Sequence, residues 1–464
     1  MRSTGMTLAA VLGLLAPAAL AGGGRFVPLG NPRIETHHAR DVSTNPQGVP
    51  FVMGQVRRPD GTSEAALFTI QPNGDVTPQM LTVPDGMPPR RSAWGATSGG
   101  AVVVGNAQQV AFPQQLGQAV VWNPPSEPAM PLPCLQTTKD PNDGNCECMD
   151  GFKCDACDDS RGTVIIAVGI SFNDNFSVRL PTVWRSDNAW APQQLDLLPG
   201  GLQVGSANAG NARDNGVITI VGEAVGTISE AVIWDGETGQ VRKVLPRGTA
   251  RAAIALAVSR DDRYVAGWGL DDNFGVVGMI WEDPDGDGAY TLNTPTLPAG
   301  VLDSFFNAVE VVDSAARGEQ VVAVGCGFDG QTGDLVALFY DGAGGLRRLS
   351  DVLVNENGID LQGHTLTDAT GLRRRPDAIH ICGNGVNSGG GDEGWYAEIA
   401  LGAVPCPGDL DGDGQVSLTD LAILLSNFGT VGGATPEQGD LDGDGDVDLA
   451  DLALMLGVFG TACA

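Results

Sequence analysis

The sequence of 464 residues is poor in basic side chains: 26 Lys and Arg stand against 56 Asp and Glu, with four His, for a formal net charge of −30. Nucleic acids and anionic membranes both require a basic footprint on the protein that binds them, so the sequence argues against either as a partner. Divalent cations are the natural counterions of so many carboxylates. Solubility alone could nevertheless explain the acidity outside the C-terminus.

Long apolar runs are also scarce. Residues 6–20 form one behind Arg2, and Ala19-Leu20-Ala21 offers a small-x-small cleavage site before Gly22. The run is too short to span a hydrocarbon core of about 30 Å, so a signal peptide over residues 1–21 is favoured over a membrane anchor. The sequence therefore predicts a secreted protein, extracellular or at the cell surface, with no membrane insertion after cleavage.

The chain has nine cysteines, an odd number, and export favours disulfides. Five of them crowd an insertion over residues 134–158: Cys134, Cys146, Cys148, Cys154 and Cys157. Four thiolates of this cluster could bind zinc, but two disulfides are the favoured interpretation in an exported chain. Cys326 and Cys382 lie on equivalent predicted strands and could form a further pair.

No convincing amphipathic helix occurs between residues 26 and 400, where a weak repeat is found instead. A short apolar strand ends in glycine seven times, at spacings of 45 to 64 residues, at Gly54, Gly105, Gly169, Gly222, Gly267, Gly325 and Gly383. A polar turn and a second strand follow, often ending in Trp, and then a Leu-Pro segment. Four short strands per unit of about 50 residues are typical of a β-propeller blade, and seven units fit the usual range of about four to eight. A stack of sandwiches is the alternative.

The two ends of this region complement each other. The last repeat has no Leu-Pro strand, whereas RFVPLGN near the mature N-terminus resembles the missing strand. We expect the N-terminal strand to complete the last blade and so remove the exposed sheet edges. The prediction is a mainly β protein, with a seven-bladed propeller over residues 22–400.

The segments A-x-x-VS, VVG, Ala-x-x-Trp and LP of this region resemble the HAF-type extracellular repeat family of bacterial secreted proteins. The resemblance covers about 375 residues. It implies an exported, propeller-like protein and gives no catalytic residues to carry over.

After a linker at residues 401–405, two copies of one acidic pattern begin 31 residues apart, GDLDGDGQVSLTDLAILLSNFG and GDLDGDGDVDLADLALMLGVFG. Calcium takes six to eight oxygens at about 2.3 to 2.6 Å, and loops with alternating carboxylates supply them. Gly414 and Gly445 fall where such a loop turns sharply. The predicted ligands are Asp409, Asp411, Asp413, Gln415 (through its carbonyl), Ser417 and Asp420 in the first loop, and Asp440, Asp442, Asp444, Asp446, Asp448 and Asp451 in the second.

From Pro405 onward the chain has eleven Asp or Glu and no Lys or Arg, so two bound calcium ions should be needed for a compact state. Apolar residues at helical spacing follow each loop and predict two short helices packed together: Leu421, Leu424, Leu425 and Phe428, then Leu452, Leu456 and Phe459.

These two loop–helix units resemble the type I dockerin family, which predicts a small all-α domain over residues 406–464. The resemblance implies a cohesin-like or cell-surface partner, contacted through Leu418, Thr419, Leu449 and Ala450. Cys406 and Cys463 flank the domain, and the exported context predicts that they pair.

A partial copy of the calcium loop occurs in DPDGDG, at Asp283, Asp285, Asp287 and Gly288. It has no carboxylate at position twelve, so a tight turn is favoured and a third calcium site is the alternative.

The favoured function is a non-enzymatic extracellular binding protein: the propeller presents a surface to a glycan or protein ligand, and the calcium module attaches it. The alternative is a carbohydrate-active enzyme, a polysaccharide hydrolase or lyase carrying a dockerin. Glycoside hydrolysis needs two carboxylates at a fixed separation, which an acidic sequence cannot single out. The sequence has no Ser-His-Asp order, nucleotide loop, HExxH or sialidase-type Asp-box, so no catalytic residue is assigned.

Overall fold

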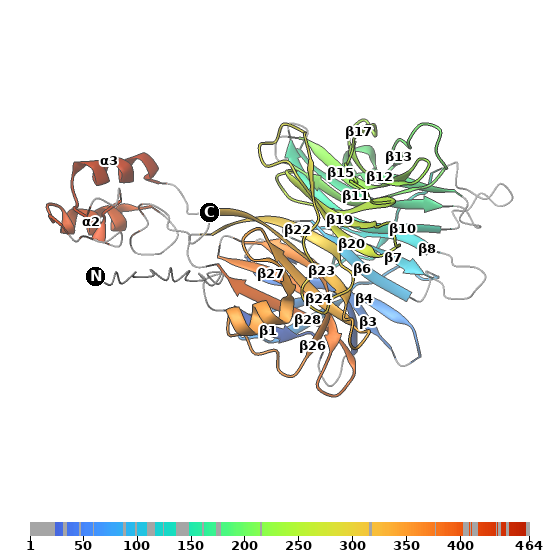
Figure 1. Cartoon of the computed structure of the whole chain (residues 1–464), viewed down its shortest axis with the longest axis horizontal. Helices are drawn as coiled ribbons and strands as arrows, with labels where there is room; N and C mark the ends of the chain where they lie inside the picture. Colours follow the sequence, from blue (N-terminus) through green and yellow to red (C-terminus); the bar gives the residue numbers. More distant parts are fainter. Residues whose placement is uncertain are drawn as a thin grey trace, which may run out of the picture.

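The chain is mainly β in a computed structural model that describes residues 24–30, 35–45, 48–58, 60–86, 90–97, 100–108, 117–123, 125–135, 148–159, 162–172, 178–213, 216–314, 318–375, 377–401, 408, 410, 416–432, 434, 438–441 and 445–460. All of the described strands belong to a β-rich body over residues 24–401, and two helices, α2 (Leu418–Asn427) and α3 (Leu449–Val458), lie outside that body (Figure 1). The signal peptide predicted at residues 1–21 lies outside the described residues.

Three separate four-stranded antiparallel sheets follow one another along residues 205–348. In each, the strands pair in chain order and are joined by short connections. They are β14 (Gly205–Ala212), β15 (Ile218–Val225), β16 (Ser229–Asp235) and β17 (Val241–Val244); β18 (Ala252–Val258), β19 (Tyr264–Leu270), β20 (Val276–Glu282) and β21 (Thr291–Asn293); and β22 (Phe305–Ser314), β23 (Gly318–Phe328), β24 (Leu335–Asp341) and β25 (Gly345–Arg348).

A twelve-stranded sheet precedes them and consists of three similar groups of four. Only single parallel bridges join the groups, Ser63 to Arg90 and Gly117 to Cys148. The groups are β2 (Glu35–Thr44), β3 (Pro50–Arg57), β4 (Ser63–Ile70) and β5 (Val76–Met80); β6 (Arg90–Ala96), β7 (Val103–Gln108), β8 (Gly117–Trp122) and β9 (Met130–Pro131); and β10 (Cys148–Asp159), β11 (Gly162–Phe172), β12 (Arg179–Arg185) and β13 (Pro192–Gln194). A short helical turn, η2 (Ser186–Asn188), lies between β12 and β13.

The last sheet joins the two ends of the β-rich body. Strand β1 (Gly24–Pro28) pairs antiparallel with β28 (Asp392–Ala400), beside β27 (Ala378–Val386) and β26 (Thr365–Arg374). The predicted pairing of the N-terminal strand with the last repeat is therefore confirmed. A short helical segment, α1 (Leu349–Asp351) with η3 (Val352–Glu356), was not predicted; it buries Leu349, Val352 and Leu353 beneath this sheet.

The repeated glycines lie opposite a β-bulge in the first strand of their group. A Cβ on Gly222 would lie 1.9 Å from the carbonyl oxygen of Ser206, just before the bulge at Ala207/Ala209. The same close approach, 1.9 to 2.3 Å, recurs at Gly54, Gly105, Gly267, Gly325 and Gly383. Only a residue without a side chain fits this contact, which accounts for the glycine at these six positions. The prediction that the strands end at the glycines is wrong, because each strand continues past its glycine, as β15 does to Val225.

The repeated Trp side chains and Leu-Pro segments together connect each sheet to the preceding one by hydrogen bonds. The indole of Trp234 in β16 donates a hydrogen bond of 2.7 Å to the carbonyl of Asp196, which follows β13 of the preceding group. The residue before that acceptor, Leu195, is fully buried and its N–H bonds to Pro181 of its own group. The same arrangement joins Trp122 to Thr82, Trp184 to Pro133 and Trp281 to Pro246. Buried apolar clusters fill the space between consecutive sheets around these contacts.

The C-terminal helices are α2 (Leu418–Asn427) and α3 (Leu449–Val458). Their shared core is small: Val416, Leu424, Val447 and Met455 are buried. The expectation that Leu425, Phe428, Leu456 and Phe459 pack the helices together is wrong, because these side chains are 39 to 57% exposed. Among the described residues, no helix has the length and apolar character that crossing a membrane requires.

Candidate functional site

The two C-terminal loop–helix units repeat one set of hydrogen bonds 31 residues apart. Both carboxylate oxygens of Asp420, which is fully buried, accept backbone N–H groups, from Leu410 at 2.6 Å and from Ser417 at 2.8 Å. Asp451, equally buried, accepts from Leu441 and from Asp448, each at 2.7 Å. The last carboxylate of each loop is thus fixed at the start of the following helix.

A capping box begins each helix. The Ser417 hydroxyl accepts the N–H of Thr419 at 3.1 Å, and Asp448 accepts that of Ala450 at 2.6 Å. Asp420 and Asp451 complete the boxes at the third helical position. An acidic side chain there satisfies N–H groups that the helix leaves unpaired, so the loops and helices are one local structure.

The described residues of the second loop have the donors that calcium requires. Carboxylate oxygens of Asp446, Asp448 and Asp451 lie within 4.8 Å of one another, a spacing compatible with oxygens at about 2.3 to 2.6 Å around one ion. Asp440 accepts the N–H of Gly445 at 3.0 Å, which closes the sharp turn of the loop. Six of the predicted ligands lie outside the described residues: Asp409, Asp411, Asp413, Gln415, Asp442 and Asp444. The predicted pair Cys406 and Cys463 also lies outside them.

Each loop is tied to the end of the other unit's helix. Gly429, just after α2, donates its N–H to the carbonyl of Val447 in the second loop, and Gly460, just after α3, donates to Val416 in the first, both at 2.8 Å. The two predicted ion sites therefore share one small scaffold, and loss of one ion should loosen the other loop.

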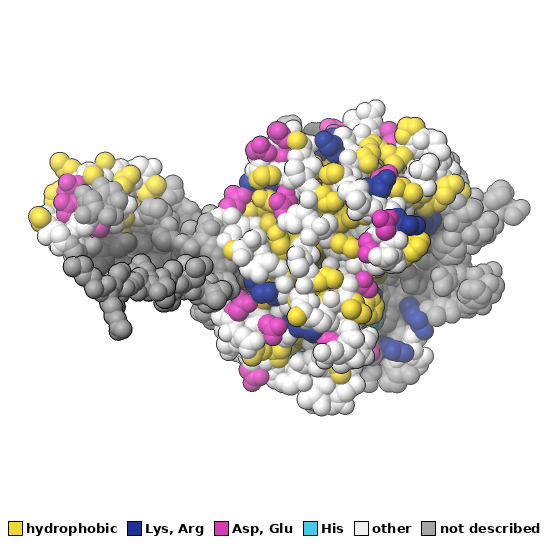
Figure 2. Space-filling view, in the orientation of Figure 1, with side chains coloured by type: hydrophobic (Ala, Val, Ile, Leu, Met, Phe, Trp, Pro, Cys, Tyr) yellow, Lys and Arg dark blue, Asp and Glu magenta, His cyan; other side chains and the backbone are white. Residues whose placement is uncertain are grey.

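Apolar side chains are exposed at matching positions of the two units. Leu418 and Leu449, at the starts of the helices, are 75% and 72% exposed, and Thr419 and Ala450 beside them are exposed as well. Leu425 and Leu456 continue the apolar surface along the helices. Hydrophobic side chains are visible on the outside of this part of the chain in Figure 2.

The partial loop DPDGDG has the turn of a calcium loop with an incomplete donor set. Asp283 is buried and accepts the N–H groups of Asp287 at 3.1 Å and Gly288 at 2.9 Å. Oxygens of Asp283, Asp285 and Asp287 lie within 4.8 Å of one another. The contact from Asp283 to Gly288 repeats that from Asp440 to Gly445, but Thr294 stands where the last carboxylate would be.

A central cavity of about 340 Å³ is lined by the bulge residues of the first strands. Six of its seven described lining residues are the extra residue of a bulge: Arg40, Trp94, Asn208, Leu256, Asn307 and Thr370. A bulge redirects a side chain that would otherwise alternate with its neighbours. The repeated glycines and the cavity are therefore two consequences of one local irregularity.

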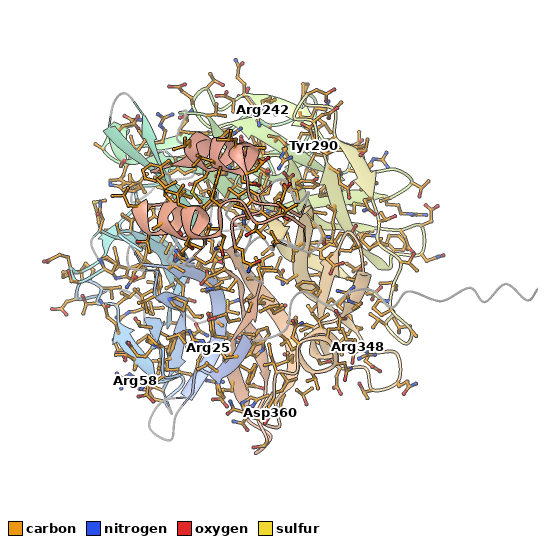
Figure 3. The ribbon with its side chains drawn as sticks, turned by 90° about the vertical axis from the view of Figure 1, so that its left-hand side faces the viewer. Arg25, Arg58, Arg242, Tyr290, Arg348 and Asp360 are labelled. Atoms are coloured by element: carbon orange, nitrogen blue, oxygen red, sulfur yellow. The ribbon has the colours of Figure 1, made fainter. Side chains whose placement is uncertain are left out.

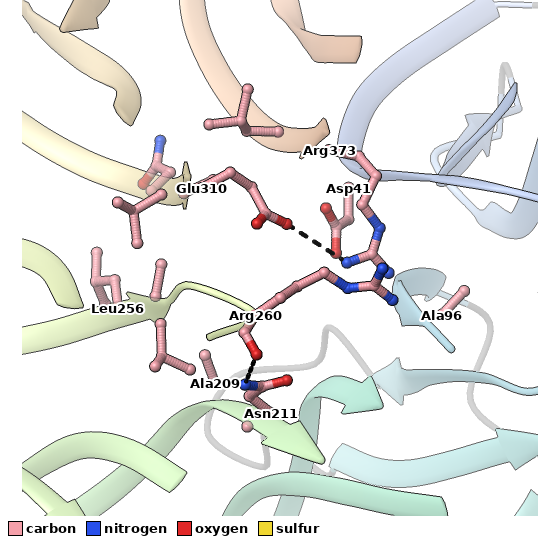
Figure 4. A pocket seen from close by; sticks show the side chains of 15 residues that line it. Asp41, Ala96, Ala209, Asn211, Leu256, Arg260, Glu310 and Arg373 are labelled. Atoms are coloured by element: carbon pink, nitrogen blue, oxygen red, sulfur yellow. Dashed lines mark hydrogen bonds and ion pairs between the residues drawn. The ribbon is translucent and has the colours of Figure 1, made fainter. Parts of the chain in front are cut away.

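The remaining described lining residue is Asp368, a carboxylate close to Arg40. It accepts a hydrogen bond of 2.9 Å from Asn307, and burial raises its pKa. A smaller cavity of about 80 Å³ lies further along the same first strands, where Glu310 and Arg373 form an ion pair of 3.6 Å (Figure 4). Charges of both signs thus meet at the centre of the body.

The structure corrects one cysteine expectation. Cys326 and Cys382 are both buried and neither forms a disulfide, so they do not pair with each other. Burial raises the pKa of Cys326, which also lies beside Asp368. Cys134 is buried, but the side chains of Cys146, Cys148, Cys154 and Cys157 lie outside the described residues, so the pairing within the insertion stays a prediction.

The chain is thus a mainly β protein with a C-terminal pair of acidic loop–helix units whose donors suit calcium. Residues 407–456 match the family model of the dockerin type I domain. Dockerin domains bind calcium and cohesin partners, and occur in extracellular or cell-surface proteins. The comparisons give no support for the resemblance of the repeat region to the HAF-type family.

No curated protein matches the chain. Among solved structures, Trypanosoma rangeli sialidase is 10% identical with a TM-score of 0.40, over 81% of this chain and 57% of the sialidase. A protein of unknown function from Dyadobacter fermentans is 9% identical with a TM-score of 0.43, over 81% of this chain and 98% of that one. The Pyrococcus horikoshii acylaminoacyl peptidase is 11% identical with a TM-score of 0.43, over 79% and 52% of the two chains.

Proposed function

We propose that the chain is an exported binding protein: a β-propeller that binds a ligand without catalysis, attached to a cohesin-like or cell-surface partner through its calcium-loaded dockerin module. The duplicated geometry of Asp420 and Asp451 carries this proposal. In both units the same buried carboxylate joins the acidic loop to the helix that presents the exposed apolar pair.

The propeller is proposed as a closed ring of seven blades. The arrangement of the strands supports it, because the four-stranded sheets and the three groups of the twelve-stranded sheet repeat one order. The pairing of β1 with β28 supports closure between the first and last parts of the body. A closed ring leaves no long sheet edge exposed.

Binding is favoured over hydrolysis by the lining of the central cavity. Among the described residues that line it, Asp368 is the single carboxylate, whereas glycoside hydrolysis generally uses two that flank the bond. A carbohydrate-active enzyme remains the alternative function. It predicts that the purified chain releases sugars from a polysaccharide and that Asp368→Asn abolishes the release.

Calcium binding is tested by calorimetry on the full mature chain. We expect two sites, both lost in Asp409→Ala/Asp440→Ala, because these carboxylates open the two loops. Asp283→Ala is the matched control and should keep both sites. A third site that disappears in Asp283→Ala would assign calcium to DPDGDG as well, and no binding at all would overturn the proposal.

Docking is tested by titrating the full chain with a cohesin in calcium and in EGTA. We expect binding in calcium alone, and its loss in Leu418→Asp/Leu449→Asp, since a carboxylate would be buried against an apolar partner surface. Val431→Asp, at a side chain 86% exposed in the same module, is the control. Unchanged binding by the double variant would contradict this surface.

A further inference from the structure

A third cavity, of about 280 Å³, lies where the first and second strand groups meet. Four arginines line it: Arg40 of β2, Arg57 at the end of β3, and Arg90 and Arg91 at the start of β6. No Asp or Glu occurs among its described lining residues. The chain as a whole is acidic, with 56 Asp and Glu against 26 Lys and Arg, whereas the side chains that line this cavity carry net positive charge. We call it the arginine pocket.

The parallel bridge between β4 and β6 assembles the pocket. Ser63 pairs with Arg57 across β3 and β4 and with Arg90 across β4 and β6, so two arginines 33 residues apart come to one place. The Ser63 hydroxyl also exchanges hydrogen bonds of 3.2 Å with the backbone of Arg91. The pocket is therefore built on paired strands and not on a loop.

Two of the arginines are available to a ligand. Within the described part of the chain, neither Arg57 nor Arg90 forms a salt bridge, and both are exposed. The nearby Glu64 is already paired with Arg58, at 2.6 Å, and neither of them lines the pocket. An arginine guanidinium recognises a carboxylate through two parallel hydrogen bonds, so the pocket has donors that suit an anionic ligand.

The rest of the lining suits a ligand with hydroxyl groups. The Ser92 hydroxyl is 5% exposed and has no hydrogen-bond partner among the described residues. The amides of Gln55 and Asn106 can both donate and accept. The indole of Trp94, with the guanidinium of Arg40 stacked on it at 4.1 Å, adds an apolar wall. The volume lies just below the range of about 300 to 1,000 Å³ for drug-sized ligands, which suits a single sugar unit.

From this lining we infer that the arginine pocket binds an acidic sugar, a sugar unit that bears a carboxylate. The inference rests on the proposed function, because it names the ligand class of the binding platform. The carboxylate would lie against Arg57 and Arg90, and the hydroxyl groups against Ser92, Gln55 and Asn106.

The test titrates the full mature chain with glucuronate, glucose and inorganic sulfate by ligand-observed NMR. We expect glucuronate to bind, and glucose, which has a hydroxymethyl group in place of the carboxylate, to bind at least about tenfold more weakly, since each charged pair contributes strongly. Added salt should weaken glucuronate binding. Sulfate binding as tight as glucuronate would overturn the sugar assignment.

The variants Arg57→Gln and Arg90→Gln, singly and together, place the site. We expect each to weaken glucuronate binding at least about fivefold and the pair to abolish it. Arg58→Gln makes the same change of charge beside the pocket (Arg58 is labelled in Figure 3) and should bind as the wild type does. Wild-type affinity in the double variant would overturn the inference. Calcium titrations of the same proteins separate this result from a failure of the calcium module.

Discussion

The glycines of the repeat are required by contact and not by backbone conformation. Gly222 has an ordinary φ, yet a Cβ there would overlap the Ser206 carbonyl oxygen, which is backbone and cannot move aside. We therefore expect Gly222→Ala to lower the free energy of unfolding by at least about 2 kcal/mol, the upper range for overpacking.

The matched control is Gly226→Ala, directly after the end of β15 in the connection to β16. The nearest atom to a Cβ there is in Leu198 at 3.7 Å, and its φ is also ordinary. We expect a change within about 0.5 kcal/mol by urea denaturation. Equal losses for the two variants would show that the close approach at the bulge does not limit the sequence.

His380 gives the β-rich body a pH dependence. It is buried in β27 against Tyr396, and burial lowers its pKa to about 4. The unfolded chain takes up this proton below its ordinary pKa of 6.5, whereas the folded chain does not until about pH 4. Stability from this group is therefore complete above pH 6.5 and is lost as the pH falls towards 4, by up to about 3 kcal/mol.

We expect His380→Phe to flatten the stability profile between pH 6.5 and 4 relative to the wild type, measured as urea midpoints across that range. Phenylalanine keeps the ring packing, and the Tyr396 hydroxyl keeps its hydrogen bond to Glu398 at 2.9 Å. Parallel profiles for the two proteins would assign the acid sensitivity to other groups.

Among the elements, the strand that ends in Trp connects neighbouring sheets through its indole N–H. Trp234→Phe keeps an aromatic side chain but leaves the Asp196 carbonyl without this donor. A lost hydrogen bond in a buried setting costs about 1 to 3 kcal/mol, and we expect a loss of that size. Trp395→Phe serves as comparison, because Trp395 donates within its own sheet, to Asn384.

The two variants should differ in the cooperativity of unfolding. If the indoles couple the sheets, Trp234→Phe should also lower the urea m-value or split the transition, whereas Trp395→Phe should shift the midpoint alone. Single, equally steep transitions for both would mean that apolar packing alone couples the sheets.

Local sequence patterns carried much of this fold and site. Strand order and the presence of α2 and α3 follow from short-range signals, namely alternating apolar residues, turns and helical spacing. The pairing of the N-terminal strand follows from the strand that the last repeat lacks. The helices start at Leu418 and Leu449, before the last predicted ligand of each loop, whereas the apolar spacing placed them after the loops, from Leu421 and Leu452. The bulges could not be predicted in this way, because the extra residue of a bulge breaks the alternation of apolar and polar residues on which strand prediction depends. The glycine on the next strand is an indirect sign of each bulge. The arginine pocket depends on the bridge between Ser63 and Arg90, which joins two strand groups. The sequence around Arg57 and Arg90 gives no sign of this long-range contact.

For the C-terminal helices, the sequence predicted more packing than the structure shows. Helical spacing correctly predicted α2 and α3 but overstated their core, since Leu425 and Leu456 are exposed. Two ten-residue helices have too little partner surface to cover every apolar side chain. In so small a module we expect bound calcium to replace part of the missing core.

At the scale of the whole molecule, the calcium module and the β-rich body should respond separately to chelation. Between the described residues of 24–401 and those of 408–460 no hydrogen bond or ion pair is formed. We expect EGTA to remove the helical circular dichroism of α2 and α3 and leave the melting temperature of the body unchanged. A lower melting temperature of the body in EGTA, absent in Asp409→Ala/Asp440→Ala, would reveal coupling between them.

The N-terminal strand tests whether the body is a closed ring. Removal of residues 22–30 deletes β1, with the buried Phe26, Val27 and Leu29, and exposes the edge of β28. At about 1.5 to 3 kcal/mol for each buried side chain, the loss is on the order of 5 kcal/mol, comparable with the total stability of many domains. We expect the shortened chain to unfold at much lower urea and to aggregate through the open edge, as measured by denaturation and size-exclusion chromatography. The triple variant Phe26→Ala/Val27→Ala/Leu29→Ala keeps the backbone pairing and should lose stability without aggregating, because the edge stays covered. The shortened chain could instead stay monomeric and be as stable as the triple variant. The pairing of β1 with β28 would then not hold the ring closed, and the ring would be open in solution.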